Sequence, residues 1–457
     1  MTMPAKSVHI LTLGCARNET DSDELAGRLN SAGWNLVDDP ADATAVLVNT
    51  CGFVEAAKAD SIQTLLQTAD LKSDGVVKAV VAIGCMAERY GNELAAEIPD
   101  ADAVLGFDAY EDLGDTLAKI VGGQKIDSHT PIDRRLATPK APSERVHSSS
   151  GEVIRLRLDS KPVAPLKIAS GCDRRCTFCA IPAFRGSYVS RRPTDIIAEA
   201  VWLSERGVRE LFLVSENTTS YGKDLGDMNL LEALLPALSS IEKIERIRLS
   251  YLQPAEMRPQ LLNAILNTEK VVPYFDLSFQ HASATVLRRM RRFGSKDEFL
   301  QLIASIRKQS PDAGIRSNFI VGFPGETEEE LAELCEFINE AELDAVGIFG
   351  YSDEDGTEAF TFGEKLSQTE INRRVEYVTS LADEISNQKA ESRIGMQVSV
   401  LIESVSDAYE GRAEFQGPEV DGSCEVISER DLEVGDFVSA IVISNDGADL
   451  VVEEISN

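Results

Sequence analysis

The sequence contains 457 residues, of which 43% are hydrophobic and 26% are charged, and its net charge is −31. A chain of this length and composition allows about two to four domains and excludes both a miniprotein and a disordered polymer. The acidic charge argues against a broad basic surface for nucleic acid and favours a basic protein partner. No uncharged apolar run approaches the roughly 18 residues that span a bilayer, and the start lacks the apolar region of a secretory signal. We therefore expect a folded cytoplasmic protein without a membrane partner.

The first predicted domain covers residues 1–121, where short apolar runs alternate with helical patterns. This alternation is typical of a doubly wound α/β fold with a parallel sheet. The expected strands are 9–13, 45–48 and 79–83, and the expected helices are 21–32 and 54–69. Each expected strand leads into a cysteine, namely Cys15, Cys51 and Cys85. Because ligands bind at the carboxyl ends of parallel strands, the three cysteines would meet in one crevice. The alternative is that a small apolar residue simply suits a strand end.

Three further regions follow the first domain. Residues 122–165 contain glycines, prolines and three consecutive serines, which predict a linker with a short β-ribbon at 153–158. In residues 166–392 the expected strands are 166–170, 210–215, 246–252, 274–279, 315–323 and 344–352. The expected helices there are 195–206, 230–239, 258–266, 284–291, 297–308, 328–341 and 368–392. Six repeats are too few for a closed eight-stranded barrel, so we expect a partial six-stranded βα barrel. Short β runs in residues 394–457 predict a small β-barrel.

The eight cysteines of the chain are better candidates for metal ligands or catalytic groups than for cytoplasmic disulfides. Zinc is disfavoured, because the four histidines lie far from any cysteine–histidine zinc spacing. The loop SGCDRRCTFC brings together Cys172, Cys176 and Cys179 directly after the first barrel strand.

Thiolates are the usual ligands of iron–sulfur clusters, and a four-iron cluster ordinarily takes four of them. Three thiolates leave one iron open, and an open position indicates a metal that takes part in chemistry. Radical reactions of S-adenosylmethionine are one such chemistry. A zinc knuckle or a redox dithiol is the alternative interpretation of this loop.

This loop, with the aromatic Phe178 before its last cysteine, resembles the radical S-adenosylmethionine superfamily. Together with LGCARNETDSD, NTCGFVEAAK, GCMAERY, FDLSFQHAS, NFIVGFPGETEEE and FGYSDEDGT, it makes essentially the whole chain similar to the methylthiotransferase family. The resemblance implies a C-terminal TRAM-like β-barrel that binds the substrate. It also implies two [4Fe–4S] clusters, a radical cluster on Cys172, Cys176 and Cys179 and an auxiliary cluster on Cys15, Cys51 and Cys85.

The same resemblance implies two molecules of S-adenosylmethionine, one as the radical source and one as the methyl donor. It further implies sulfur carried on the auxiliary cluster and a low-potential electron donor. We expect cofactor contacts from Phe178, Glu216 and Gly322, of which Glu216 stands where the superfamily often has a glycine-rich motif that is absent here. Gly322 would permit close backbone approach, although an ordinary strand-to-helix turn is nearly as good an explanation.

Two smaller features complete the set of candidate residues. The run of Arg288, Arg289, Arg291 and Arg292 either neutralises the clusters or the substrate, or forms a solvated helix face. The remaining cysteines have structural explanations: Cys335 is expected in the core and Cys424 has no cysteine near it in the sequence.

The substrate divides the family into two branches. One branch methylthiolates an adenosine of transfer RNA, and the other the β-carbon of an aspartate in the small-subunit ribosomal protein numbered twelve. The segments YFDLSFQHAS, YGKDLGD and EGRAEFQGPEVDG resemble the second branch, whereas SENTTSYG departs from its more usual Gln-Asp pair.

Composition gives a separate argument about the substrate. Residues 394–457 carry fifteen acidic and two basic residues, which favours a basic ribosomal protein over RNA. We therefore expect no direct transfer RNA substrate, and the transfer RNA reaction is the alternative function. A non-enzymatic electron-transfer module would explain the six cysteines of the two triads but would leave the barrel and the C-terminal domain without a role.

Overall fold

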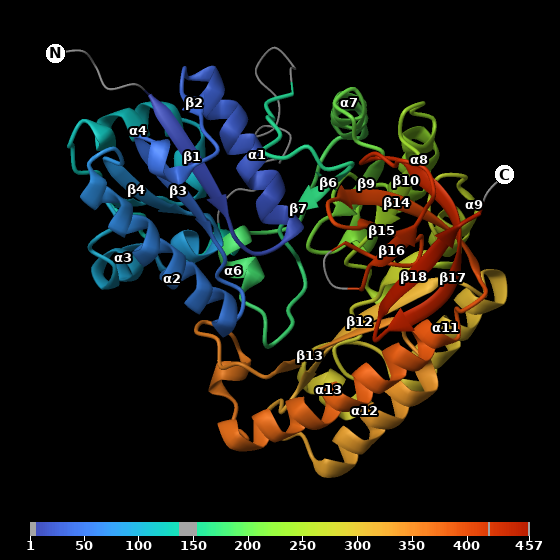
Figure 1. Cartoon of the computed structure of the whole chain (residues 1–457). Helices are drawn as coiled ribbons and strands as arrows, with labels where there is room; N and C mark the ends of the chain where they lie inside the picture. Colours follow the sequence, from blue (N-terminus) through green and yellow to red (C-terminus); the bar gives the residue numbers. More distant parts are fainter. Residues whose placement is uncertain (1–5, 137–152, 419–420, 456–457) are drawn as a thin grey trace. The chain divides into compact units, whose positions relative to one another are not determined.

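The structure is a computed structural model that describes residues 6–136, 153–418 and 421–455 (Figure 1). The chain forms two compact units. The first comprises Met1–Ser160, Ser170–Arg174 and Ala180–Asp195, and the second comprises Lys161–Ala169, Arg175–Cys179 and Ile196–Asn457. Within the described ranges, every helix is too short or too polar to cross a membrane.

The first unit is built on a five-stranded sheet in the order β2-β1-β3-β4-β5. Its strands are β1 (Ser7–Thr12), β2 (Asn35–Leu36), β3 (Ala45–Thr50), β4 (Ala79–Ile83) and β5 (Ala103–Val104). All neighbouring strands are parallel, as the doubly wound fold requires. The direction of strand succession reverses between β1 and β3, and such a switch point is where open α/β sheets bind ligands.

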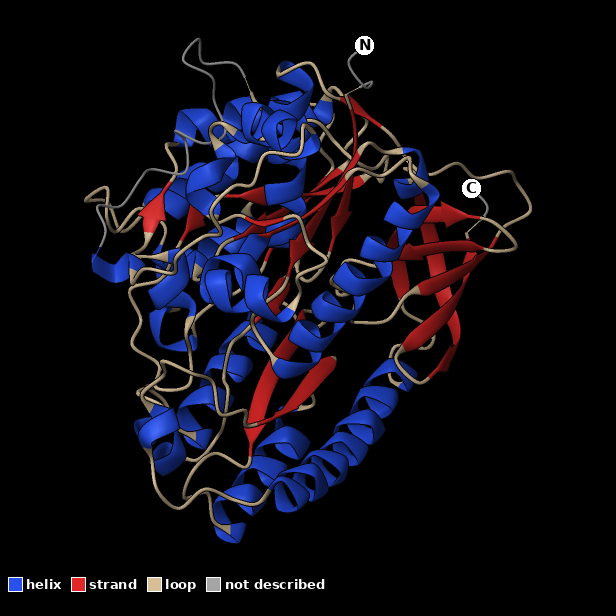
Figure 2. Cartoon of the chain, turned by 90° about the vertical axis from the view of Figure 1, so that its left-hand side faces the viewer, coloured by secondary structure: helices blue, strands red, loops and turns tan. Residues whose placement is uncertain are grey.

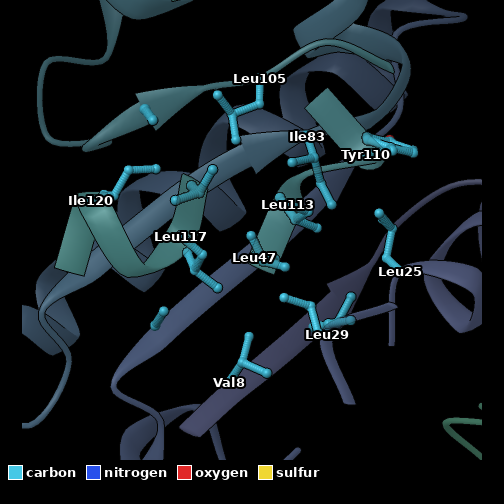
Figure 3. Packing of buried hydrophobic residues seen from close by; sticks show 14 of the residues in the cluster. Val8, Leu25, Leu29, Leu47, Ile83, Leu105, Tyr110, Leu113, Leu117 and Ile120 are labelled. Atoms are coloured by element: carbon cyan, nitrogen blue, oxygen red, sulfur yellow. The ribbon is translucent and has the colours of Figure 1, made fainter. Parts of the chain in front are cut away.

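Helices cover both faces of this sheet. The helices are α1 (Ala16–Ser31), α2 (Glu55–Asp70), α3 (Gly84–Glu97) and α4 (Leu113–Val121). On one face, Leu47 of β3 packs with Leu29 of α1 and Leu117 of α4 (Figure 3). On the other face, Val46 and Val48 pack with residues of α2 and α3. The alternation along β3 follows the two-residue period of a strand and explains why its sequence is apolar throughout.

Of the short β-ribbon predicted at 153–158, the described residues contain a single β-bridge position, Val153, and no strand. This segment is instead held to α1 by Asp23, whose carboxylate accepts hydrogen bonds from the Arg155 side chain at 2.8 Å and from the Leu158 backbone at 3.0 Å. A long-range ion pair thus replaces the local pairing that the sequence suggested. Residues 137–152 of the predicted linker lie outside the described residues.

Short elements complete the first unit and flank the cysteine loop. The 3-10 helices are η1 (Pro40–Asp42), η2 (Leu71–Asp74), η3 (Phe107–Tyr110) and η4 (Arg134–Leu136). Around the loop lie β7 (Ala169–Ser170), α6 (Ile181–Arg185) and β8 (Val189–Ser190). Elements this short contain too few residues to show a period in the sequence.

The second unit contains the six expected barrel strands. They are β6 (Val163–Lys167), β9 (Glu210–Val214), β10 (Arg246–Leu249), β11 (Tyr274–Asp276), β12 (Gly314–Val321) and β13 (Ala345–Gly350). They form two parallel three-stranded sheets, β10-β9-β6 and β11-β12-β13. Isolated bridges from Ile247 to Val271 and from Leu252 to Leu277 connect the two sheets. The arrangement is the partial barrel that the repeat number predicts, and β6 begins inside the predicted linker.

Helices connect the barrel strands as expected. They are α7 (Pro193–Ser204), α8 (Leu230–Ser239), α9 (Pro259–Asn267), α10 (Ala284–Arg289), α11 (Lys296–Gln309), α12 (Glu328–Ala341) and α13 (Gln368–Glu391). The 3-10 helices between them are η5 (Thr218–Ser220), η6 (Pro254–Glu256) and η7 (Ala359–Thr361). Helix α12 starts with a capping box between Thr327 and Glu330, which explains its sharp beginning.

The second unit ends in a closed barrel of strand order β14-β15-β16-β18-β17 (Figure 2). Its strands are β14 (Gln397–Val405), β15 (Tyr409–Arg412), β16 (Cys424–Ile427), β17 (Phe437–Asp446) and β18 (Asp449–Glu454). Inward residues such as Val400, Val426 and Val452 form one apolar core. This C-terminal barrel confirms the small β-barrel predicted from the turn-rich sequence.

The C-terminal barrel packs on the amino ends of the strands of the partial barrel. Arg246, the first residue of β10, donates hydrogen bonds to the carbonyl oxygens of Ser399 at 2.8 Å and Arg412 at 3.0 Å. At the start of β11, the Tyr274 hydroxyl donates to Asp421 at 2.5 Å. The loops at the carboxyl ends, including the one that begins at Gly322, are therefore at the other end of the strands.

Candidate functional site

Each of the first three cysteines lies where the chain leaves a strand of the parallel sheet. Cys15 is the N-cap of α1, Cys51 follows β3, and Cys85 lies in the first turn of α3. Gly14 adopts a φ of +96°, and a Cβ atom there would lie 3.0 Å from the Cys51 Sγ atom. The glycine at position 14 therefore lets the backbone turn between β1 and Cys15.

Polar side chains hold the backbone around these thiols. The Ser61 hydroxyl accepts a hydrogen bond from the Cys51 N–H at 2.9 Å and so ties that residue to α2. Asn18 donates to the Leu13 carbonyl at 2.8 Å, and its Oδ1 atom lies 3.5 Å from the Cys85 Sγ atom. Asn18 therefore links the start of α1 to the start of α3.

Arg185 of α6 reaches the same place from a later part of the first unit. Its Nη2 atom lies 3.0 Å from the Cys85 Sγ atom and 3.1 Å from the Asn18 Oδ1 atom. The same nitrogen lies 3.0 Å from a carboxylate oxygen of Asp21, and the Arg185 side chain is only 5% exposed. No local pattern in the sequence indicated that an arginine would approach these cysteines.

Electrostatics distinguish the three thiols. Burial opposes ionisation of Cys15, but the guanidinium groups of Arg17 and Arg185 and the Asn18 N–H together outweigh it, so that the pKa of Cys15 is lowered. Burial raises the pKa of Cys51, and it raises the pKa of Cys85 to about 11 against the opposing effect of Arg185. The Cys15 thiol acts electrostatically on both of the other thiols, which is consistent with one shared site.

An iron–sulfur cluster fits the chemistry of this set of side chains. Its donors are three thiols with two guanidinium groups close by, and thiolates are the ligands such clusters use. The buried hydroxyl of Tyr110 has no hydrogen-bond partner among the described residues. Burial is the main cause that raises the pKa of Tyr110, and the charges of Asp21 and Cys85 raise it further. No three acidic, histidine or cysteine side chains of the described residues form a site for a single ion. In a cluster each thiolate binds a different iron, so the thiols do not need to meet at one point.

The second cysteine triad lies on the loop after the first barrel strand, and all three cysteines are half-buried. In the first unit, the Cys172 N–H donates to the Gly186 carbonyl at 3.1 Å, and the Arg174 N–H points to the Cys172 Sγ atom at 3.4 Å. Backbone N–H groups that point at a thiolate stabilise its charged form.

In the second unit, the segment around Cys176 and Cys179 is bound to the end of α10. The Thr177 N–H donates to the Met290 carbonyl at 3.2 Å. The buried Arg292 has its Nη1 atom 3.9 Å from the Cys176 Sγ atom and also donates to the Ser278 carbonyl. Arg292 therefore brings positive charge to one thiol of this triad.

The four arginines of the basic run have different surroundings. Arg289 pairs with Glu330 at 2.8 Å, Arg291 pairs with Glu358 at 2.7 Å, and Arg288 is exposed. Within the part of the chain that the structure describes, Arg292 is the member of the run that contacts a cysteine. The exposed Arg288 fits a solvated helix face, whereas neutralisation of a cluster by Arg292 stays a prediction.

The three expected cofactor residues lie in ordered surroundings of the second unit. Phe178 packs against an apolar cluster that includes Met290 and Phe323. Gly322 has a φ of +76° directly after β12, and a Cβ atom there would lie 2.7 Å from Ile371. Glu216 follows β9 beside Asn217, whose N–H donates to Ser215 at 3.1 Å. Their contacts to S-adenosylmethionine remain predictions.

A buried network that no sequence motif indicates fixes the loop at Gly322. Both carboxylate oxygens of Glu326 accept the Gly322 N–H at 3.0 Å, and Arg374 of α13 donates to Glu326 at 2.7 Å. The Nε2 atom of the fully buried His281 lies 3.5 Å from Glu326. Burial opposes ionisation of Glu326, but these donors lower its pKa below the ordinary value. The sequence offered the glycine but no indication of its partners.

The two remaining cysteines differ in exposure. Cys424 is buried in the C-terminal barrel, where burial raises its pKa to about 12 and its thiol donates to Gln416. Cys335 lies at the edge of the apolar face of α12 and is half-buried. It is therefore more exposed than the predicted core position.

The loop with three cysteines after the first strand of a partial six-stranded barrel defines a radical S-adenosylmethionine protein. The corresponding family model, the radical SAM superfamily, matches residues 166–338. Models described as uncharacterized protein family UPF0004 and TRAM domain match residues 7–106 and 394–455. The expected order of an N-terminal α/β domain, a radical barrel and a TRAM-like barrel is thereby confirmed.

Similar proteins with known names identify the family more narrowly than the domain models do. A protein of Nocardioides sp. named ribosomal protein uS12 methylthiotransferase RimO is 58% identical over 97% of this chain and 96% of its own length. The protein of that name from Streptomyces coelicolor is 54% identical over 99% of this chain and 97% of its own length. This chain belongs to the RimO family of ribosomal protein uS12 methylthiotransferases.

Solved structures show the same fold at much lower identity. The radical S-adenosylmethionine methyltransferase TsrM from Kitasatospora setae matches with a TM-score of 0.54 and 13% identity, over 76% of this chain and 75% of that chain. The cobalamin-dependent radical enzyme OxsB matches with a TM-score of 0.51 and 12% identity, over 82% of this chain and 56% of that chain.

Proposed function

We propose that this protein transfers a methylthio group to the β-carbon of an aspartate in ribosomal protein uS12. The observation that carries the proposal is the combination of two cysteine triads in a chain that matches RimO proteins over nearly its whole length. When bound, iron–sulfur clusters supply the electron for radical cleavage of S-adenosylmethionine and a site that carries sulfur. The substrate would be a basic protein in the cytoplasm, and a low-potential donor would deliver the electrons.

The roles of the cysteines follow from their surroundings. Cys172, Cys176 and Cys179 would hold the radical cluster, and Cys15, Cys51 and Cys85 the auxiliary cluster. Arg292 and Arg185 would each balance part of the negative charge that thiolate ligands bring into a buried site. The network of His281, Glu326 and Arg374 would keep Gly322 in its turn, where S-adenosylmethionine is expected to approach.

Replacing one triad at a time tests this division. After anaerobic reconstitution, changing Cys172, Cys176 and Cys179 to Ala should remove half the iron and abolish cleavage of S-adenosylmethionine. Changing Cys15, Cys51 and Cys85 to Ala should also remove half the iron but leave some cleavage, because these thiols belong to another part of the fold. Full iron content in the second variant would contradict the auxiliary cluster.

The substrate is tested in cells. Mass spectrometry of uS12 from cells with and without the gene should show loss of the methylthio group on one aspartate. Loss of a modified adenosine from transfer RNA instead, with uS12 unchanged, would favour the alternative function and leave the methylthiotransferase chemistry intact.

A further inference from the structure

The buried side chain of Arg185, which is only 5% exposed, donates a hydrogen bond to a thiol of the N-terminal triad. Its Nη2 atom is 3.0 Å from the Cys85 Sγ atom, well within the distance of a hydrogen bond to sulfur. The Cζ atom of Arg185 lies 5.1 Å from the centre of the Phe107 ring, so the ring covers the guanidinium group. A charge placed this firmly in a dry site acts strongly on its neighbours.

Asp21 limits that charge. Its carboxylate lies 3.0 Å from the same Nη2 atom, and its side chain is 9% exposed. Asp21 and Cys85 therefore share one donor nitrogen, together with Asn18. A substitution at Asp21 should therefore change the strength of the hydrogen bond from Arg185 to the Cys85 thiol.

We propose that Arg185 is a positioning residue that donates a hydrogen bond to the Cys85 thiolate and raises the reduction potential of the auxiliary cluster. The negative charge of Asp21 opposes this effect and lowers the potential. The inference rests on the proposed function, because it takes Cys85 as a cluster ligand. Hydrogen bonds to ligand sulfurs and local charge are among the factors that set such potentials. A reduced cluster carries one more negative charge than an oxidised one, so a nearby cation favours the reduced form.

The test uses the full chain with Cys172, Cys176 and Cys179 changed to Ala, so that one cluster remains. The midpoint potential is measured by anaerobic redox titration with electron paramagnetic resonance. Arg185→Met should lower the equilibrium constant for reduction about tenfold or more, which equals about 59 mV for one electron. Arg185→Lys, which keeps the charge, should restore part of the shift. Asp21→Asn should move the potential in the opposite direction.

Arg134 provides the matched control. Its Cζ atom lies 5.6 Å from the centre of the same Phe107 ring, but its hydrogen bonds go to Glu88 and Asp108. Arg134→Met should therefore leave the potential near that of the parent, even if it lowers the unfolding temperature. Iron content and thermal unfolding of every variant separate loss of the fold from an effect on the cluster.

The outcomes distinguish the two proposals. A parent that binds no iron would overturn the auxiliary cluster and this inference with it. A parent that binds iron, with the same potential in Arg185→Met and Asp21→Asn, would overturn the inference alone. If Arg185→Met lost its iron, recovery of iron by Arg185→Lys and a raised potential in Asp21→Asn would support the inference, and their absence would overturn it.

Discussion

Single residues around the N-terminal cysteines have little freedom to change. At Gly14 the backbone is in the left-handed region, and an added Cβ atom would lie 2.9 Å from the Cys51 Cβ atom. Gly33 also has a positive φ, of +81°, but nothing lies within 4 Å of its added Cβ atom. A comparison of variants at the two glycines therefore separates the effect of backbone strain from the effect of displacing a thiol.

We expect Gly14→Ala to lose the iron of one cluster, because Cys51 must move to accommodate the methyl group. Gly33→Ala should cost about 1–2 kcal/mol of stability from strain and keep its iron. Iron analysis after reconstitution and thermal unfolding measure the two effects. Equal iron in both variants would mean that the position of Cys51 is not critical.

At the scale of single residues, the sequence predicted the cysteines of the site but not the polar side chains that surround them. The cysteines stood out because each follows an apolar run. Arg185 and Tyr110 showed no such signal, because their electrostatic interactions with Asp21 and Cys85 depend on how distant segments fold together. Arg292 belongs to a basic run, and a run of arginines does not indicate which of its members is buried.

Among the elements, the starts of β9 and β10 carry a buried ionic network. Glu210 is fully buried, 2.8 Å from Arg248 and 3.5 Å from both Arg246 and Arg412. Burial opposes ionisation of Glu210, yet the three guanidinium groups lower its pKa to about 2. The network connects the partial barrel to β15 of the C-terminal barrel through charges, not through apolar contacts alone.

Glu210→Gln should destabilise the second unit by about 3–5 kcal/mol, because it leaves buried arginines without their anion. The folded pKa is below the ordinary value of 4.5, so the carboxylate stabilises the fold fully above about pH 4.5 and loses this effect as pH falls towards 2. Denaturant unfolding at several pH values should show a weaker acid dependence in the variant.

Glu245→Gln is the control for this prediction, because Glu245 pairs with Arg209 at the surface beside the same strands. An exposed pair is worth under about 1 kcal/mol. Comparable losses in the two variants would contradict a special role for the buried network.

The elements themselves were largely predictable. Helices α8 and α12 have the predicted bounds, because each combines an apolar face with clear ends. The failures were the ribbon at 153–158, which a long-range ion pair replaces, and the short strands, which have too few residues for a period. The charged residues at the starts of β9 and β10 could not be recognised as buried, since their partners lie far along the chain.

For the whole molecule, the acidic face of the C-terminal barrel is the main candidate for contact with a basic protein. Glu410 of β15 and Glu425 of β16 are exposed and directly opposite each other in the antiparallel register. Like charges at opposite positions destabilise a sheet. By contrast, Asp421 is buried and Glu414 accepts the Ser399 N–H at 3.1 Å, so these acids are structural.

Glu410→Lys should stabilise the C-terminal barrel by about 0.2–1 kcal/mol, since it converts a repulsive cross-strand pair into an attractive one. The same change should weaken binding of uS12, and the difference should shrink as salt rises, because exposed charges are screened. Binding titrations at several salt concentrations and thermal unfolding measure both effects.

Glu93→Lys makes the same charge change on the exposed surface of α3 and is the control for net charge. If it weakened binding as much as Glu410→Lys, long-range attraction to the whole acidic protein would explain the effect. If neither variant changed binding, the C-terminal barrel would not dock its partner through charge.

The attachment of the C-terminal barrel to the amino ends of the strands has a consequence for the size of the substrate. A strand of eight residues such as β12 spans about 26 Å, so an anchor on the C-terminal barrel lies about one strand length from chemistry at the carboxyl ends. Such an anchor acts as a tether: it raises the effective concentration of the target aspartate, provided that the bound molecule bridges the distance. Whole uS12 should therefore react with a lower KM than a short peptide around the aspartate, with similar kcat, and equal KM values would show that the reaction needs no distant anchor.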